Sequence, residues 1–511
     1  MLPIFLIEPR VRRILFVAAL FVALFLYTVH LTSDLYGDEV AHTYRVVATG
    51  NFWANIKDPS MCHPPLYFVL AKVSYNIIGK PWAIRIPSLL FSLGSIVLVA
   101  FVAKRILGSE FYLPAIWLAT LSPFLLEFSA EGRAYSMLIF FSIALLWSFL
   151  LFLQRENVSN MLLLSAISIC GALTHYFFFF QLISLCIYYV IVRKGVSRFA
   201  LGSCGIIGLM LAPAFYQLFI GQNGQFANYL QVGWSEIYFS VTNFLGRLCV
   251  AIAYGFSTFS LPNLDPARNI TFTAVRENWL LILLVLISFA GIAYACLRLV
   301  IIRLNWVWLF LIGIFIPVGL GLVAGKSGLY LIREKHLAVI WVFYFFLLLL
   351  VLRYLIRARF GWFVIACHFS VMLVSLFHYV VYPDDYTRRM NWTGLNRTLE
   401  REIGKKDVIL FYNGDLQSLS LGNMRILEQD VKAINLQTDR PRGISLTGFA
   451  QLLGEKFKGT VFLINNETDR HAVDPNSEVI MVFRSIREIC EQRFGRNLIL
   501  YRFKPYSSLV H

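Results

Sequence analysis

Charged side chains are scarce in this sequence. Asp, Glu, Lys and Arg make up 14% of the 511 residues, whereas a soluble globular chain carries about 25%. The mean hydropathy of +0.67 points the same way. This shortage excludes an ordinary soluble domain and places the chain among membrane proteins. Its uncharged runs repeatedly reach the ~20 residues that a membrane span requires.

Acidic residues are the scarcer of the two charged kinds. The chain has 29 Asp and Glu against 45 Lys and Arg, a formal net charge of +16. Such an excess could indicate nucleic-acid binding. The basic residues, however, stand mostly in short clusters between apolar runs, as they do in loops that orient a membrane protein. We therefore expect membrane lipids, and no nucleic acid, as partners.

The cysteines do not form a CxxC motif. Most of the eight lie inside apolar runs, where cysteine behaves as a small packing residue. Cys62 and Cys490 both fall in segments expected outside the membrane, and a disulfide between them is left open.

The N-terminal apolar run follows Arg10, Arg12 and Arg13. It is too long for a signal-peptide core and has no clear cleavage site, so we expect a retained signal anchor with its N-terminus in the cytoplasm. Residues 63–79 decide the remaining topology. If they crossed the membrane, the Lys104–Arg105 pair would lie outside and every later basic loop would be inverted. We therefore predict that this segment lies along, or dips into, the outer face.

This topology gives about eleven spans. The predicted spans are 14–31, 84–104, 111–128, 135–153, 159–174, 176–192, 199–220, 278–297, 305–324, 337–353 and 362–381. The predicted cytoplasmic turns are Lys104–Arg105, 154–157, 192–198, 298–305 and 353–360. The spans on either side of "THYFFFF" are short, so two tight crossings or one re-entrant segment remain open.

Charged residues return after residue 383. The stretches "KKDVILFYNGD" and "KGTVFLINNETD" predict short strands, and "SLTGFAQLLGEKF" predicts a helix capped by Ser445 or Thr447. The predicted fold is thus an all-α polytopic membrane domain, residues 1–383, followed by a small extracytoplasmic α/β domain, residues 384–511.

Polar clusters gather on the outer side of the predicted topology. They are Asp38, Glu39 and His42; His63 before two prolines; Glu131, Arg133 and Tyr135; and Lys326, Arg333, Lys335 and His336. Ionisable groups at span ends are costly to bury and often mark function. A carboxylate from the first cluster could deprotonate an acceptor. Arg333, Lys335 and Arg133 could hold a phosphate.

Each cluster also has a purely structural interpretation. Asp38 and Glu39 could belong to a solvated loop, and His63 could cap a helix. Glu131 and Arg133 could form a structural pair at a turn. We expect the remaining histidines of the apolar part, His175, His368 and His378, to serve helix ends or packing.

Several stretches in order resemble one enzyme family. They are "DEVAHTYR", "HPPLYFVLAKVSYNIIG", "AIRIPSLLFSLGSIVLVAFVAKRILG", "LSPFLLEFSAEGRAYSMLIFFSIALL" and, more loosely, "YLIREKHLAVIWVFYFFLLLL". The chain resembles the GT-C superfamily of membrane glycosyltransferases that use polyprenyl-phosphate sugars, in particular glycosyltransferase family 39-like proteins. The resemblance implies Asp38, with Glu39 beside it, as catalytic base. It also implies juxtamembrane helices in the first outer loop. The second outer loop, with Glu131, Arg133 and Tyr135, would then face the same cavity as Asp38.

The resemblance implies a transferase in the bacterial inner membrane with a periplasmic C-terminal domain. Its donor would be a polyprenyl-phosphate sugar and its acceptor a lipid, glycan or protein. Two departures leave the phosphate ligand and the sugar open. His63 stands where aminoarabinose transferases have Lys, and Lys335–His336 stands where the family has Arg-Tyr. Glu-Gly-Arg replaces DxD-like acids in the second outer loop, so we expect no metal cofactor.

Two other functions remain open. A transporter or flippase of lipid-linked glycans should show inverted-repeat halves and helices broken at mid-membrane, and the sequence lacks both. A polysaccharide polymerase or ligase should have a long outer loop late in the chain, which residues 221–277 could supply.

Overall fold

The computed structural model forms two compact units. The first, here called the helical unit, comprises residues 1–31, 51–79 and 83–381; the second comprises 32–50, 80–82 and 382–511. The structure describes residues 8–35, 39–48, 51–57, 64–219, 276, 279–302, 304–326, 338–358, 360–381, 392–404, 406–411, 432–436, 439–441, 444–456, 459–466, 477–486, 488–493 and 498–504.

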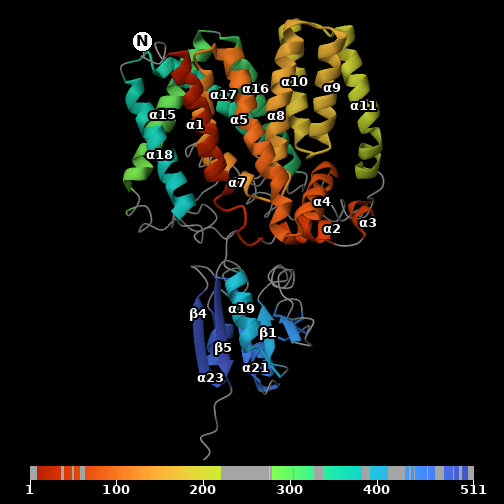
Figure 1. Cartoon of the computed structure of the whole chain (residues 1–511), viewed down its shortest axis with the longest axis vertical. Coiled ribbons are helices and arrows are strands. Elements are labelled where there is room, and N and C mark those ends of the chain that lie inside the picture. Colours follow the sequence, from red (N-terminus) through yellow and green to blue (C-terminus); the bar gives the residue numbers. More distant parts are fainter. Residues whose placement is uncertain are drawn as a thin grey trace, which may run out of the picture. The chain divides into compact units, whose positions relative to one another are not determined.

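Most of the helical unit consists of helices that lie side by side (Figure 1). They are α1 (Pro9–Thr28), α5 (Ile86–Leu107), α8 (Tyr135–Gln154), α9 (Val158–Ala172), α10 (Phe178–Arg193), α11 (Arg198–Phe219), α15 (Trp279–Ile301), α16 (Asn305–Lys326), α17 (Ala338–Leu355) and α18 (Gly361–Val381). The shorter helices are α3 (Phe52–Lys57), α4 (Leu66–Ile78), η3 (Pro81–Arg85), α6 (Tyr112–Thr120) and α7 (Pro123–Ser129).

Six helices of the described residues are long and apolar enough to cross a membrane. They are α1, α5 with the preceding turn η3, α8, α15, α17 and α18. The chain is therefore a multi-pass membrane protein, as its composition predicts. The other apolar helices are shorter, so the count of about eleven spans stays a prediction.

The predicted span 111–128 is two helices rather than one. α6 ends at Thr120, and α7 begins at Pro123 after Ser122, whose hydroxyl accepts a hydrogen bond from the backbone N–H of Leu125 at 3.5 Å. Serine at this position favours a new helix start, and proline suits its first turn. The break shortens the segment and places residues 123–134 at one end of the helical unit.

α4 is too short to cross a bilayer upright. It has 13 residues, which span about 20 Å at 1.5 Å per residue, against a hydrocarbon core of ~30 Å. It follows Pro64–Pro65 and ends at Gly79, whose positive φ of 68° gives the left-handed C-cap that glycine favours. Its length supports the outer-face interpretation of residues 63–79.

A reporter experiment tests this topology. Alkaline phosphatase, which is active only outside the cytoplasm, should be active when fused after Lys80 and inactive when fused after Gly108. The reason is that α5, and not α4, makes the crossing between these two positions. A fusion after Gly195 serves as a cytoplasmic control. Activity after Gly108 but not after Lys80 would invert the predicted orientation.

The basic turns gather at one end of the helical unit, here called the basic end. Arg105 at the end of α5 donates to the side-chain oxygen of Gln154 at the end of α8. Arg353 near the end of α17 donates to the carbonyl of Leu107 at 3.0 Å. The Tyr188 hydroxyl of α10 donates to the carbonyl of Asn305 at 3.5 Å. These contacts join turns that the charge pattern assigns together to the cytoplasm.

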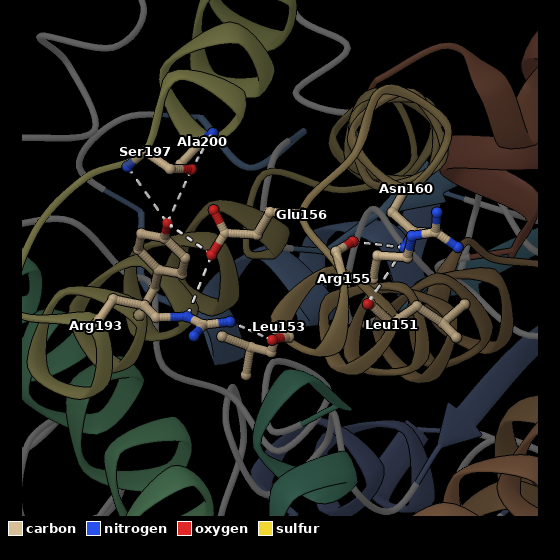
Figure 2. Close-up of polar contacts among 9 residues, drawn as sticks. Leu151, Leu153, Arg155, Glu156, Asn160, Arg193, Ser197 and Ala200 are labelled. Atoms are coloured by element: carbon tan, nitrogen blue, oxygen red, sulfur yellow. Dashed lines mark hydrogen bonds and ion pairs between the residues drawn. The ribbon is translucent and has the colours of Figure 1, made fainter.

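Figure 2 shows a network of polar contacts at the basic end. The carboxylate of Glu156 lies 3.2 Å from Nε of Arg193 and accepts a hydrogen bond from the Tyr189 hydroxyl, also at 3.2 Å. The same hydroxyl accepts from the backbone N–H of Ser197 at 3.4 Å. Beside it, the amide nitrogen of Asn160 donates to the carbonyl of Arg155 at 2.7 Å. The network ties the α8–α9 turn to the α10–α11 turn.

Helix α17 forms the centre of the helical unit. Nearly every residue from Ala338 to Leu352 is buried, as expected of a helix that is apolar on all sides. Trp341 stacks on Phe124 of α7, with ring centroids 5.9 Å apart. At the end opposite the basic end, the carbonyl of Tyr379 in α18 lies 3.1 Å from Nε2 of His30 after α1. We call this the α7 end; α4 and α7 lie there (Figure 1).

The C-terminal part of the second unit is a five-stranded sheet in the order β2-β1-β3-β5-β4. Its strands are β1 (Val408–Phe411), β2 (Lys432–Asn435), β3 (Val461–Asn466), β4 (Glu488–Arg493) and β5 (Leu498–Lys504). β2, β1 and β3 are parallel, and β5 and β4 continue the sheet antiparallel. Both predicted strands are present, in β1 and β3.

The helices of this sheet region are α19 (Trp392–Glu402), α21 (Leu446–Lys456) and α23 (Glu478–Ile486). Phe449 of α21 and Phe483 of α23 join the strands in one apolar core. Of the two predicted caps of α21, Ser445 and Thr447, the cap is Ser445, whose hydroxyl accepts from the backbone N–H of Gly448 at 3.0 Å. The predicted fold class, a helical membrane part with a small C-terminal sheet region, is confirmed.

Candidate active site

The loop between α7 and α8 buries two charged side chains. Glu131 is 3% exposed and Arg133 is 8% exposed. The loop is tight because the backbone N–H of Glu131 donates to the carbonyl of Phe128 at 3.3 Å, and that of Arg133 donates to the carbonyl of Glu131 at 2.8 Å. Buried charges at the end of an apolar bundle are costly. The loop is therefore not a turn whose charged side chains lie in solvent.

The ring of Tyr135, the first residue of α8, contacts the side chains of Arg133, Phe128 and His175. The guanidinium carbon of Arg133 lies 5.5 Å from the ring centroid, which is within the range of a cation–π interaction. The rings of Phe128 and His175 lie 5.2 and 5.6 Å from it. Arg133 and Tyr135, predicted together from the sequence, are thus in contact, and His175 joins them from the α9–α10 turn.

The α9–α10 turn holds His175 with several backbone and side-chain contacts. The backbone N–H of His175 donates to the carbonyl of Gly171 at 3.2 Å, and Nδ1 of the ring accepts from the backbone N–H of Phe177, also at 3.2 Å. A Cβ atom at Gly171 would lie 2.2 Å from the ring of Phe178, so the turn closes only over glycine. The N–H of Leu66 donates to the carbonyl of Leu173 at 3.2 Å, which attaches the start of α4 to this turn.

A second hydrogen-bonded chain connects α4 with the Arg133 loop. The hydroxyl of Tyr67 donates to the carbonyl of Ile84 at 2.8 Å and lies 2.8 Å from the Ser88 hydroxyl. Ser88 in turn donates to the carbonyl of Arg133 at 3.1 Å. Three segments far apart in sequence, the start of α4, the start of α5 and the 130–134 loop, therefore have fixed positions relative to one another.

The sequence did not single out Arg85, which is also buried at the α7 end. Its guanidinium donates to the carbonyls of Leu31 at 3.0 Å and His30 at 3.3 Å, past the end of α1. A cation suits the carbonyl end of a helix. One sequence feature could have identified Arg85. It lies at the predicted outer end of a span, where the positive-inside rule does not expect a cation, and the same argument identified residues 326–336. The sequence also assigned His175 to a helix end and did not connect it with Tyr135.

The first acidic cluster, Asp38, Glu39 and His42, belongs to the second unit. Glu39 begins the π-helix η2 (Glu39–Tyr44), its side chain is fully buried, and His42 in the same helix is partly buried. π-helical turns are rare and frequent at functional sites. The other predicted site residues, Asp38, His63, Arg333, Lys335 and His336, lie outside the described residues, as does most of the 221–277 loop.

Acidic side chains at the α7 end are Glu127 and Glu131, both buried. Within the described ranges, no group of three or more His, Cys, Asp or Glu side chains could hold a metal ion. The predicted independence of metal stays a prediction, because Asp38 and His63 lie outside those ranges.

Comparisons with known proteins cover much of the chain. Residues 62–216 match the model of the dolichyl-phosphate-mannose-protein mannosyltransferase family. The apo oligosaccharyltransferase of Archaeoglobus fulgidus superposes over 96% of this chain and 75% of its own, with 12% identity and a TM-score of 0.53. A comparison with curated protein sequences gave no match.

Two structures of ArnT from Cupriavidus metallidurans show a looser likeness. The apo form covers 96% of this chain and 97% of its own at 14% identity, with a TM-score of 0.44. The form bound to undecaprenyl phosphate covers 97% and 98% at 13% identity, with a TM-score of 0.43. The archaeal apo structure shares its fold with this chain over 96% of this chain and 75% of its own.

Proposed function

We propose that this chain, which has the fold of the GT-C superfamily of glycosyltransferases, transfers a sugar from a polyprenyl-phosphate carrier to a lipid, glycan or protein acceptor. The reaction would take place at the periplasmic face of a bacterial inner membrane. The observation that supports this most is the buried Arg133 against Tyr135, beside Glu131 and opposite the basic end. A membrane protein gains little stability from burying a guanidinium there, whereas an anionic lipid headgroup is bound well by one.

The proposed chemistry needs few groups. The acceptor hydroxyl oxygen forms a bond to the anomeric carbon, while the bond from that carbon to the phosphate oxygen breaks. The acceptor proton goes to a carboxylate, and the phosphate leaves on its lipid with an added negative charge. A cation that holds this phosphate stabilises the transition state more than the ground state, because the charge grows during the step.

The residues divide between these two roles. We assign proton removal to Asp38 or Glu39, and phosphate binding to Arg133 with Arg333 and Lys335. His42, His63, Glu131, Tyr135 and His336 would line the substrate site. The family whose model matches residues 62–216 is named for a dolichyl-phosphate sugar donor. Since dolichol is itself a polyprenol, this name favours a lipid-phosphate donor.

The function can be tested on the full chain in lipid nanodiscs. Undecaprenyl-phosphate sugars with radiolabelled sugar should donate their label to envelope lipid or glycan fractions, with release of undecaprenyl phosphate, while nucleotide sugars should not. Mass spectrometry of envelope glycolipids from a deletion strain would then name the acceptor. Transfer from nucleotide sugars alone, or movement of intact lipid-linked sugar across the bilayer without bond cleavage, would contradict the proposal.

A further inference from the structure

The side chain of His175 has a defined tautomer. Its Nδ1 accepts a hydrogen bond from the backbone N–H of Phe177 at 3.2 Å. A nitrogen that accepts from an N–H carries no proton of its own, so the ring is neutral and its proton is on Nε2. The turn thus presents a fixed, uncharged N–H donor.

This donor belongs to the same cluster as the cation of the proposed site. Tyr135 contacts both side chains, with the His175 ring centroid at 5.6 Å and the Arg133 guanidinium carbon at 5.5 Å. His175 is 4% exposed, and the ring centroid of Phe177 lies 5.2 Å from that of His175. The backbone bond from Leu66 to Leu173 holds the turn against α4. The imidazole is therefore held in place by two elements.

A phosphate on a lipid carries several acceptor oxygens but only one or two charges. It is bound well by cations together with neutral donors. A neutral imidazole adds a donor without the desolvation penalty of a further buried cation. We propose that His175, through its Nε2–H, is a hydrogen-bond donor to the phosphate of the lipid carrier, beside Arg133. This assignment rests on the proposed function and deepens it, because it names a phosphate ligand from the α9–α10 turn.

Two amide variants separate the donor from a structural role. His175→Asn places an oxygen near the position of Nδ1, so it keeps the acceptor for Phe177 and loses the distant donor. His175→Gln places its NH₂ near the position of Nε2, so it keeps the donor and loses the acceptor. The full chain in nanodiscs is titrated with undecaprenyl phosphate, and with undecaprenol as the control that lacks phosphate.

We expect the Asn variant to bind undecaprenyl phosphate about tenfold or more weakly, the effect of removing a hydrogen bond to a charged group. It should bind undecaprenol like the parent chain. The Gln variant should stay within about threefold of the parent for both lipids. If the Asn variant binds undecaprenyl phosphate like the parent, His175 serves the turn alone and the assignment is wrong.

Two further measurements test the assignment even if a variant does not fold. Thermal unfolding in the same nanodiscs shows whether the variants fold. If either does not, ¹⁵N-histidine spectra of the parent should show an Nε2–H tautomer whose signal moves with undecaprenyl phosphate and not with undecaprenol; no such movement overturns the assignment. A parent chain that binds both lipids equally would instead contradict the proposed function itself, together with this assignment.

Discussion

Replacing Asp38 with Asn is expected to abolish sugar transfer while expression and membrane insertion stay unchanged. The substitution keeps the size of the side chain and removes the carboxylate that would accept the proton of the acceptor hydroxyl. Loss of a general base costs about 10²–10⁴-fold in rate. The measurement is the initial rate of transfer from an undecaprenyl-phosphate sugar, with variant and parent reconstituted at equal amounts.

Glu39→Gln is the matched comparison, because it neutralises the neighbouring carboxylate in the same way. Glu39 begins the π-helix η2 and is buried. If Asp38 is the base, the Gln variant should keep a much larger share of the activity than the Asn variant. Full transfer by Asp38→Asn, with loss in Glu39→Gln, would move the base to Glu39. Full transfer by both would place the base outside this segment.

Replacing Arg133 with Gln is the second change with a large expected effect. The guanidinium is buried against Tyr135, and we propose that it holds the phosphate as negative charge develops. Removing one such donor typically costs about 10²–10³-fold in rate. Arg133→Lys keeps the charge but not the planar, multiply donating group, so it should fall between Gln and the parent.

The control for Arg133 is Arg155→Gln at the basic end. Arg155 is exposed, and its backbone carbonyl, not its side chain, accepts from Asn160. Transfer by this variant should equal that of the parent chain. If Arg133→Gln folds and transfers sugar at the parent rate, the phosphate is held elsewhere. Residues 326–336 are then the next segment to test.

The fold is shared with the apo archaeal oligosaccharyltransferase, and the roles of the site residues stay predictions. The sequence placed Arg133 and Tyr135 in one cluster because they are two residues apart, and the structure confirms their contact. Tyr135 and His175, by contrast, are forty residues apart, on two different turns. No local pattern connects them.

The sequence by itself determined the membrane class, the positions of most helices, the two strands β1 and β3, and the restriction of the α21 cap to Ser445 or Thr447. These features follow from composition, apolar run length and turn residues, all of which act over a few neighbouring positions. Only the tertiary structure decided which side chains meet. α8 is apolar on nearly every side, so its sequence cannot show which face meets α5 and which meets α10. The packing of whole helices therefore brought His175 to Tyr135 and Arg85 to the end of α1, and no spacing along the chain shows these contacts.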